Sequence, residues 1–359
     1  MKICYLANAA SVHTQRWARH FADRGCHVSI VSFQPGEIGG VEVFTLPPVF
    51  SRPRVDVVLN LGRIRRLVRR IAPDILHAHY VTSYGLAGAI SGWRPFIATA
   101  WGDDVLVAPE ESLLYRLMVR WALSRADLVT SMAEHMTAFM NRRHYSVPDK
   151  IVTLPFGVDT QQFCPSCRTR RHGELPARVI STRHLEDEYD VQTLIRAIPT
   201  VVDRCPGTQF VVVGDGGLRP FLENLAVDLG VRQYTEFLGK VPHEHVSHLL
   251  GRADVFVTTS TSDGNNISLN EAMACGAFPV ATDIPANRAW IEHRKNGLLF
   301  SCRDSEQLAD AIIEALWRPD WRQDVMDQNW EIVCTRASWS HSMVEMERHY
   351  FRLLQEERI

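Results

Sequence analysis

The feature that most limits the possible folds is a regular alternation of short apolar segments with amphipathic helical segments, which runs through the chain twice. The apolar segments of the first series are Lys2–Leu6, Val28–Ser32, Val41–Phe44, Ile75–Ala78, Phe96–Thr99 and Leu128–Ser131. Those of the second series are Arg178–Ser181, Gln209–Val213, Thr235–Leu238, Val255–Thr258 and Phe278–Ala281. Strands of this length separated by helices predict βαβ units and parallel sheets. We therefore expect an α/β protein with two Rossmann-like, doubly wound domains in tandem.

The length of the chain agrees with this organisation, because 359 residues correspond to about two domains at roughly 100–200 residues each. A turn-rich, basic segment at Phe156–Pro176 separates the two series. We predict an N-terminal domain over residues 1–165 and a C-terminal domain over residues 166–339. Ligands of such sheets bind beyond the carboxyl ends of the strands, so a cleft between the domains is the expected site.

Composition places the chain among soluble globular proteins, with 46% hydrophobic and 22% charged residues. Disordered, collagen-like and small disulfide-rich classes are excluded. No apolar stretch approaches the ~20 residues that a membrane helix needs. The first residues, Met1–Leu6, have the pattern of a buried strand rather than of a signal peptide, which predicts an intracellular, cytoplasmic protein.

Charge is unevenly distributed along the chain. Residues 1–165 carry 18 Lys+Arg and 13 Asp+Glu, whereas residues 166–359 carry 21 and 28, which together give the net charge of −2. The basic excess is concentrated in Arg63–Arg70, where cations alternate with aliphatic residues. Such a helix suits an anionic membrane surface or an anionic acceptor, and a solvated helix face is the alternative. A nearly neutral chain gives no reason to expect nucleic acid as a partner.

The eight cysteines are scattered, and an intracellular chain of this size usually keeps them reduced. Cys164-Pro-Ser-Cys167 is the one CxxC motif; no second ligand pair stands nearby, so we expect a proline-containing loop rather than a metal or redox site. His243, His245 and His248 have helical spacing, and a solvated helix start is the favoured interpretation over a metal site. No metal is predicted.

A dinucleotide cofactor is disfavoured by the glycine pattern. Gly214-Asp-Gly-Gly217 follows a strand, but Arg219 stands where the third glycine of the fingerprint belongs. The first strand is followed by Asn8–Ser11, without a glycine run. No cofactor is expected.

The most informative segment is Ser260–Gly276, which follows the strand at Val255–Thr258. Seven residues separate Asp263 from Glu271, at the transition from a loop to a helix. Free backbone N–H groups at such a helix N-terminus can bind a diphosphate, and the residues expected to supply them are Gly264, Asn265, Asn266, Ile267 and Ser268. Glu271 could then accept hydrogen bonds from ribose hydroxyls, and Asp263 from sugar hydroxyls. The alternative is a capped helix with unrelated carboxylates.

These residues, followed by Glu271-Ala-Met-Ala, resemble the retaining glycosyltransferases of family 4, which have the two-domain GT-B fold. Further matching segments occur in the family's order: Asp74–His79, Pro155–Phe163, Val212–Gly216, Phe237–Val241 and Asn296–Phe300. The resemblance covers almost the whole chain. It implies that Glu271 binds the nucleotide ribose, that Asp263 contacts the donor sugar, and that the last helix, within 340–359, crosses back to the N-terminal domain.

Three departures from the family pattern affect the expected chemistry. Asp263 replaces the usual glutamate, and an acidic residue stands where a lysine that clamps the diphosphate usually follows Arg183. Arg183 keeps a bidentate fork for phosphate, and His184 or Tyr189 could supply a further donor. The third departure is Trp101-Gly-Asp-Asp104, where many members have a histidine that this chain lacks.

The resemblance implies front-face displacement, in which the leaving phosphate helps to deprotonate the acceptor, and Arg183 and the helix N-terminus stabilise the departing diphosphate. Asp104 and His79 are the expected acceptor-side residues, although His79 could equally be a hydrogen-bonded histidine at a strand end. Ser11, His13 and Arg16 follow the first strand and are expected to face the acceptor or the phosphate, although for Arg16 a position on the helix surface is the favoured interpretation. The remaining expected donor-site residues are Gly214, Asp215, Tyr189 and Lys240.

The sequence thus predicts a metal-independent, retaining enzyme that transfers a sugar from a UDP- or GDP-sugar to a hydroxyl group of a glycan, a lipid-linked or a small acceptor. A nucleotide-sugar epimerase of the same fold and a catalytically inactive sugar-nucleotide-binding protein are the alternatives.

Overall fold

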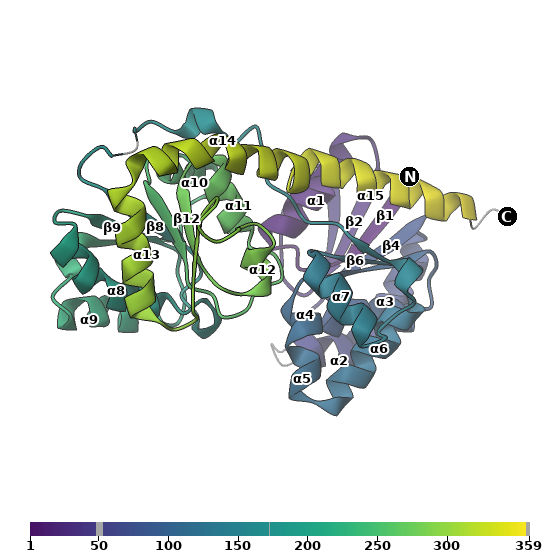
Figure 1. The fold of residues 1–359 in the computed structure, drawn as a ribbon. Helices are drawn as coiled ribbons and strands as arrows, with labels where there is room; N and C mark the ends of the chain where they lie inside the picture. Colours follow the sequence, from purple (N-terminus) through teal and green to yellow (C-terminus); the bar gives the residue numbers. More distant parts are fainter. Residues whose placement is uncertain (48–52, 172, 357–359) are drawn as a thin grey trace. The chain divides into compact units, whose positions relative to one another are not determined.

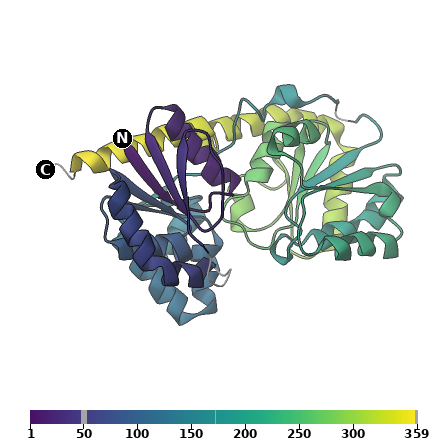
Figure 2. The same cartoon turned by 180° about the vertical axis from the view of Figure 1, so that it is seen from behind.

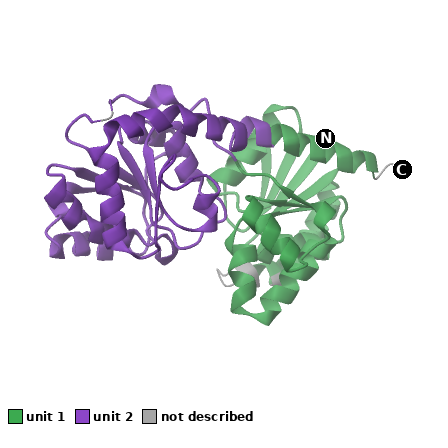
Figure 3. Ribbon diagram, viewed as in Figure 1, with its two compact units in different colours: residues 1–156, 343–359 green, residues 157–342 purple. Residues whose placement is uncertain are grey.

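The computed structural model describes residues 1–47, 53–171 and 173–356. It divides into two compact units (Figure 3): unit 1 comprises Met1–Phe156 and Met343–Ile359, and unit 2 comprises Gly157–Ser342. Each unit is a parallel sheet with helices packed on both of its faces (Figures 1 and 2). The predicted pair of doubly wound, Rossmann-like domains is therefore confirmed.

The described part of unit 1 contains a seven-stranded sheet in the order β3-β2-β1-β4-β5-β6-β7, in which every pair is parallel. Its strands are β1 (Lys2–Leu6), β2 (His27–Ser32), β3 (Val41–Thr45), β4 (Ile75–His79), β5 (Phe96–Ala100), β6 (Leu128–Ser131) and β7 (Ile151–Thr153). β7 was not predicted, because three residues at the sheet edge are too short to give a periodic signal. The strand order reverses between β1 and β4, which is the topological switch point of this sheet.

The helices of unit 1 cover both faces of this sheet and are α1 (Val12–Asp23), α2 (Pro53–Ile71), α3 (Leu86–Ser91), α4 (Asp103–Leu106), α5 (Ala108–Glu111), α6 (Leu113–Arg125), α7 (Glu134–Arg142) and α15 (Trp339–Glu356), with a π-helical turn at Val81–Gly85. In α2, Ile64 and Val68 are buried one turn apart while the arginines between them are exposed. The apolar face of α2 is therefore used for packing within the unit.

The C-terminal helix α15 belongs to unit 1 from Met343 onward, as the crossing predicted for the last helix requires. Its Tyr350 is fully buried, and the hydroxyl lies 2.7 Å from Nδ1 of His77 and 3.1 Å from the hydroxyl of Tyr5. Nε2 of His77 lies 2.6 Å from Oγ1 of Thr99. This buried network joins α15 to β1, β4 and β5.

The described part of unit 2 contains a six-stranded parallel sheet in the order β10-β9-β8-β11-β12-β13. Its strands are β8 (Arg178–Thr182), β9 (Gln209–Val213), β10 (Thr235–Gly239), β11 (Val255–Thr258), β12 (Phe278–Thr282) and β13 (Leu298–Phe300). Its helices are α8 (Val191–Arg204), α9 (Arg219–Asp228), α10 (His243–Leu250), α11 (Ile267–Ala274), α12 (Pro285–Arg288), α13 (Ser305–Trp317) and α14 (Pro319–Arg336).

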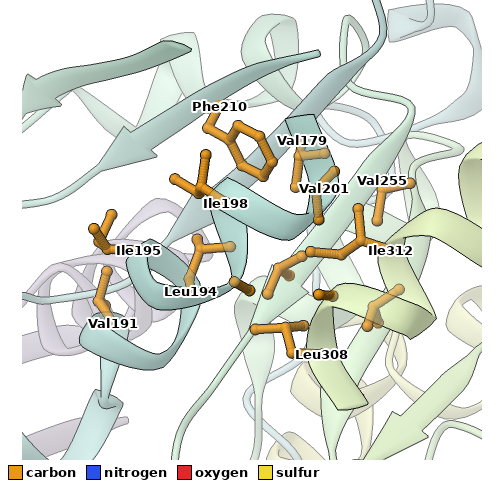
Figure 4. Packing of buried hydrophobic residues seen from close by; sticks show 14 of the residues in the cluster. Val179, Val191, Leu194, Ile195, Ile198, Val201, Phe210, Val255, Leu308 and Ile312 are labelled. Carbon is orange, nitrogen blue, oxygen red and sulfur yellow. The ribbon is translucent and has the colours of Figure 1, made fainter. Parts of the chain in front are cut away.

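Successive strand residues of unit 2 point to opposite faces of the sheet and enter two separate cores. Val179 and Val255 pack with Leu194, Ile198 and Ile312 of α8 and α13, as Figure 4 shows, whereas Ile180 and Phe256 pack on α10, α11 and α14. Burying each of these aliphatic side chains contributes about 1.5–3 kcal/mol. Because β8 and β11 are buried on both faces, their carboxyl ends are held at fixed positions.

Helix α14 was not predicted, and its buried face shows why. The buried residues are Arg322, Val325, Asn329 and Val333, so half of that face is polar and the apolar periodicity is hidden. Arg322 donates to the carbonyls of Ala315 and Leu316, and Asn329 exchanges hydrogen bonds with Asn296. These bonds allow polar side chains to occupy core positions.

The helices of the described residues include none with the combination of length and apolar character that crossing a bilayer requires.

Candidate functional site

The switch point of the second sheet lies between β8 and β11, which are neighbours whose following segments diverge. Arg183 follows β8 directly, and the loop at residues 259–266 follows β11. Because ligands of open α/β sheets bind at this point, the residues there are the first candidates for a site. The structure brings Arg183, Asp263 and Asn266 together there.

The Arg183 guanidinium is the centre of this group. It donates to the carboxylate of Asp263 in a close ion pair, to Oδ1 of Asn266 at 3.0 Å and to Oγ of Ser260 at 2.9 Å. Its Cζ lies 4.6 Å from the centre of the Tyr189 ring, which supports the planar cation from one side. Both terminal nitrogens of the guanidinium fork are used by these contacts, so a phosphate group would have to replace one of them.

Asn266 is the N-cap of α11, and both the oxygen and the nitrogen of its side-chain amide form two hydrogen bonds. Oδ1 accepts from the N–H of Leu269 at 3.1 Å as well as from Arg183, while Nδ2 donates to Thr258 at 3.2 Å and to Asn287 at 2.9 Å. Asn266 therefore ties the helix start to Arg183 and to two neighbouring segments.

The predicted row of free N–H groups at the start of α11 needs one correction. The N–H of Ile267 donates to the carbonyl of Asn265 at 2.9 Å, so it is already used within the turn. The Asn265 side chain accepts from Nε1 of Trp290 at 3.2 Å, and Oγ of Ser268 donates to the carbonyl of Thr182 at 3.2 Å. Gly264 is buried. These contacts fix the loop conformation.

Glu271 lies inside α11 and is 5% exposed. Its Oε1 lies 2.7 Å from Nε2 of His243, the first residue of α10. The sequence predicts a solvated helix start for the three histidines of α10. This prediction is wrong for His243, which is half-buried and bonded to Glu271. It agrees with His245 and His248, which are exposed. No spacing rule could find this contact, because the two residues lie on separate helices.

Gly214 and Asp215 follow β9 and lie against the segment that carries Arg183. Gly214 has a φ of +138°, and a Cβ there would come within 2.0 Å of the Arg183 carbonyl oxygen, so only glycine fits. The exposed carboxylate of Asp215 lies 3.4 Å from the Arg219 guanidinium. Lys240, after β10, is exposed. Gly214 therefore sets the position of the Arg183 backbone.

A second group of expected residues lies at the switch point of the unit 1 sheet, where β1 and β4 are neighbours. His79 ends β4 and is 1% exposed. Neither of its ring nitrogens has a hydrogen-bond partner in the described part of the chain. Burial, with a smaller contribution from the charge of His13, lowers the pKa of His79 to about 3, so the imidazole is neutral at pH 7. The structure therefore differs from the alternative considered from the sequence, in which His79 is a hydrogen-bonded histidine at a strand end.

The residues after β1 surround this imidazole with aromatic rings. His13 stacks on Phe156 with ring centres 5.1 Å apart, and Trp17 lies 5.2 Å from His79. Ser11 is the N-cap of α1, and Arg16 is half-buried on the same helix. A neutral histidine among aromatic rings provides a hydrogen-bonding group in apolar surroundings.

Asp104 is fully buried after β5, and both of its carboxylate oxygens are used. Oδ2 accepts from the N–H of Val81 at 2.7 Å, and Oδ1 accepts from the N–H groups of Trp101 and Gly102 at 3.0 and 2.9 Å. Burial raises the pKa of Asp104 to about 6, and these bonds partly oppose the shift. In this conformation Asp104 positions the Trp101 turn and offers no exposed oxygen to an acceptor.

Chemically, the unit 2 site combines a fixed cation, hydroxyl and amide groups and a buried carboxylate. This set suits an anion attached to a polyhydroxyl ligand. Among the described residues, the His, Cys, Asp and Glu side chains form no group of three that could hold a metal ion.

Comparison with known proteins gives a family match in each half of the chain. Residues 2–133 match the family described as "Glycosyl transferase 4-like", and residues 170–329 match "Glycosyl transferases group 1". A mycobacterial relative, the GDP-mannose-dependent alpha-(1-6)-phosphatidylinositol monomannoside mannosyltransferase of Mycobacterium tuberculosis, is 31% identical over 284 residues, which cover 74% of this chain and 71% of the relative.

Two further matches span most of the chain. The N-acetyl-alpha-D-glucosaminyl L-malate synthase of Bacillus anthracis is 24% identical over 86% of this chain and 82% of its own length. The structure of Anabaena Alr3699/HepE in complex with UDP and glucose superposes with a TM-score of 0.79 at 21% identity, covering 97% of this chain and 99% of the other. The second likeness shows the shared GT-B fold.

Proposed function

Because the chain belongs to the group 1 glycosyl transferases, we propose that it transfers a sugar from a nucleoside-diphosphate sugar to a hydroxyl group, with retention and without a metal ion. The observation that carries this proposal is the group at the β8–β11 switch point, where Arg183 contacts Asp263 and Asn266. This arrangement joins a phosphate-binding cation to the loop that would hold the sugar.

In the proposed donor complex, the diphosphate displaces Asp263 from the Arg183 fork, and the released carboxylate accepts hydrogen bonds from the sugar. Glu271 accepts from the ribose hydroxyls through the oxygen that His243 does not use. Moving the Asp263 carboxylate from the Arg183 cation to neutral sugar hydroxyls is favourable only if the negatively charged phosphate takes its place beside the cation. Donor binding and site rearrangement are therefore coupled.

Front-face displacement needs little covalent chemistry from the protein. The bond between the anomeric carbon and the diphosphate oxygen breaks, the acceptor oxygen bonds to the same face, and its proton passes to the departing phosphate. Arg183 and the start of α11 stabilise the negative charge that develops on the leaving group. The products are a nucleoside diphosphate and a glycoside.

We assign acceptor recognition to unit 1, with His79 as its central residue. A buried imidazole without hydrogen-bond partners costs about 1–3 kcal/mol for each unsatisfied group. Both ring nitrogens are buried in this conformation, so an acceptor hydroxyl would become the missing partner only after the surrounding rings move aside. The stacked His13 and Phe156 would cover an apolar part of the acceptor. Asp104 does not contact the acceptor itself, but it positions the turn at Trp101.

For the acceptor class we propose a lipid-linked substrate at an anionic membrane. The name of the mycobacterial relative specifies a phosphatidylinositol mannoside. In this chain Arg65, Arg66, Arg69 and Arg70 of α2 are exposed. Helix α6 adds an outward stripe of Leu113, Leu114, Leu117 and Trp121, which are 44–70% exposed. Exposed cations on one helix of unit 1 and exposed apolar residues on another each suit a lipid surface.

The other two functions considered from the sequence are an epimerase and an inactive binding protein. The relatives described above are named as a mannosyltransferase and a synthase, which favours transfer over epimerisation. An inactive sugar-nucleotide-binding protein would also need Arg183, Asn266 and Glu271, so turnover has to be measured to separate it from an enzyme.

The proposal is tested by incubating the full chain with UDP- and GDP-sugars, with and without lipid extract, and by measuring release of nucleoside diphosphate. Release that depends on the lipid extract and leaves a new glycolipid supports transfer. Interconversion of sugars without an acceptor would identify an epimerase, and nucleotide binding without turnover across the panel would identify a binding protein. Retention is checked from the anomeric configuration of the product by NMR.

A further inference from the structure

Two cysteine thiols lie in contact beside the nucleotide-binding residues of unit 2. Sγ of Cys164 and Sγ of Cys167 are 3.8 Å apart, at the two ends of Cys164-Pro165-Ser166-Cys167. A disulfide requires about 2.05 Å between the sulfur atoms and side chains that point toward each other. The two sulfur atoms must therefore move closer together before the pair can be joined.

Cys164 differs from the other cysteines in its acidity. Burial is the main factor that raises the pKa of six thiols, those of Cys4, Cys26, Cys205, Cys275, Cys302 and Cys334. Burial also acts to raise the pKa of Cys164, but hydrogen bonds from Ser166 and Cys167 together outweigh it, and the pKa is lowered. Since the thiolate is the nucleophile in disulfide exchange, Cys164 is the favoured attacking group.

Cys167 is connected to Glu271 through a continuous series of contacts. Its thiol donates to the carbonyl of Gln162 at 3.1 Å, and the Gln162 side chain donates to the carbonyl of His243 at 2.9 Å. His243 in turn bonds Glu271 at 2.7 Å. The ring of the buried Phe163 lies 5.1 Å from the His243 ring and supports it. A change at Cys167 therefore acts on the segment that positions His243.

The backbone on the other side of Cys167 has no room to move. A Cβ at Gly251 would come within 2.0 Å of the Cys167 carbonyl oxygen, and the N–H of Thr169 donates to the Gly251 carbonyl at 3.2 Å. Arg168 is fixed by bonds to the carbonyls of Ala253 and Gly276. Closure of a disulfide must then displace the segment that contains Gln162 and Cys164.

We propose that Cys164 and Cys167 form a reversible disulfide that weakens nucleotide binding by displacing Gln162 and, through it, His243 from Glu271. The oxidant is a small-molecule disulfide such as oxidised glutathione. The Cys164 thiolate attacks one of its sulfurs and releases one thiolate, and the Cys167 thiolate then attacks Cys164 and releases the second. The protein loses two hydrogens in total, and the oxidant becomes two thiols.

Once the disulfide has formed, Cys167 has no S–H group to donate to Gln162. Loss of this bond and displacement of the segment predict that UDP binds about three- to ten-fold more weakly, the effect of roughly one hydrogen bond. A thiol reductant restores binding. This nucleotide effect rests on the proposed function, whereas formation of the disulfide does not.

The experiment uses the full chain, reduced and then treated with oxidised glutathione. Peptide mapping by mass spectrometry should find the link between Cys164 and Cys167, and calorimetry should show the weaker UDP binding. Cys164→Ser should bind UDP like the reduced protein and should not respond to the oxidant. Cys302→Ser, which changes an exposed cysteine elsewhere in unit 2, should respond like the unmodified chain.

Two results would overturn the proposal: no link between Cys164 and Cys167, or a link with unchanged UDP affinity. If the reduced chain binds neither UDP nor GDP, the proposed function fails, and the coupling is then read from the NMR resonance of the His243 ring. A shift of that resonance on oxidation, absent in Cys164→Ser, supports the proposal, and an unchanged resonance refutes it.

Discussion

His243 at the start of α10 and Glu271 within α11 are joined by a hydrogen bond of 2.7 Å between Nε2 and Oε1. The Glu271 side chain is almost completely buried, and the His243 ring is about one-third exposed. A buried carboxylate with one bonded oxygen keeps the other oxygen for a ligand. The imidazole therefore orients the group that the proposed function assigns to ribose.

The first prediction concerns this pair. His243→Ala should weaken UDP or GDP binding about three- to ten-fold, because the carboxylate loses its orienting partner. Glu271→Ala should weaken it further, since the group that accepts from the ribose is removed. Calorimetric titration measures both. His245→Ala, which changes an exposed histidine of the same helix, is the matched control and should bind like the parent. Parental affinity in Glu271→Ala would refute the assignment of the ribose site.

The second prediction separates catalysis from nucleotide binding at Asp263. Asp263→Ala should reduce kcat by about 10²-fold or more, because a group that holds the reacting sugar is lost. Affinity for the bare nucleoside diphosphate should change much less, since Arg183 keeps its bonds to Asn266 and Ser260. Steady-state kinetics and nucleotide titration of the same preparation give the two values. Equal losses in both would show that Asp263 serves nucleotide binding instead.

Most of the sheet architecture and part of the site were predictable from sequence, for a physical reason. Strands buried on both faces are continuous apolar runs, which the sequence displays directly, as at Val255–Thr258. Asp263 and Glu271 were found because both lie on one loop and helix, where their separation in sequence fixes their separation in space. Arg183 was found through the family resemblance, and the structure brings it to the same loop.

The features that sequence missed depend on contacts between distant elements. The partner of Glu271 lies on a separate helix. The core face of α14 includes Arg322 and Asn329, whose polar partners lie on other segments of the chain. The buried role of Asp104 likewise depends on the N–H of Val81, which belongs to a different turn. Periodicity carries no information about such contacts.

The third prediction tests the structural role of Asp104. Asp104→Ala leaves three backbone N–H groups without their acceptor, which should lower the free energy of unfolding by about 2–4 kcal/mol. Asp149→Ala, at an exposed position elsewhere in unit 1, should change it by about 0.5 kcal/mol or less. Urea denaturation compares the two. Similar effects in both variants would mean that the three bonds contribute little.

The fourth prediction concerns binding to lipid vesicles. Replacing Arg65, Arg66, Arg69 and Arg70 by Ser should reduce co-sedimentation with phosphatidylglycerol-containing vesicles at least about tenfold, since each arginine near an anionic surface contributes about 1 kcal/mol. Replacing Leu114, Leu117 and Trp121 by Ser should reduce binding with a weaker dependence on salt, because apolar insertion is not screened. Serine at the exposed Arg204, Arg252, Arg294 and Arg303 of unit 2 is the charge-matched control. Unchanged sedimentation of both test variants would leave α2 and α6 as solvated faces.

The last prediction follows from the buried, neutral state of His79. The pKa of His79 is about 3 in the folded chain, compared with an ordinary value of 6.5. Between these two pH values, His79 is therefore protonated in the unfolded chain and neutral in the folded chain. Stability therefore falls as pH drops below about 6.5, by about 1.4 kcal/mol per pH unit for one such group. His77, whose pKa burial also lowers, acts in the same direction. Asp104 acts in the opposite direction, because its raised pKa lets the folded chain bind a proton below about 6.

Between pH 6 and pH 4, the free energy of unfolding should therefore fall less in His79→Leu than in the parent. The difference should equal the contribution of about one proton, and urea denaturation across that range measures it. At pH 7 the same variant should retain nucleotide binding, because the assigned nucleotide residues belong to unit 2, yet lose transfer to the acceptor. His245→Leu should leave the pH dependence as it is, since that side chain is exposed. A His79→Leu protein with the parental acid sensitivity would show that His79 is protonated in the folded chain, and full transfer activity would remove it from acceptor recognition.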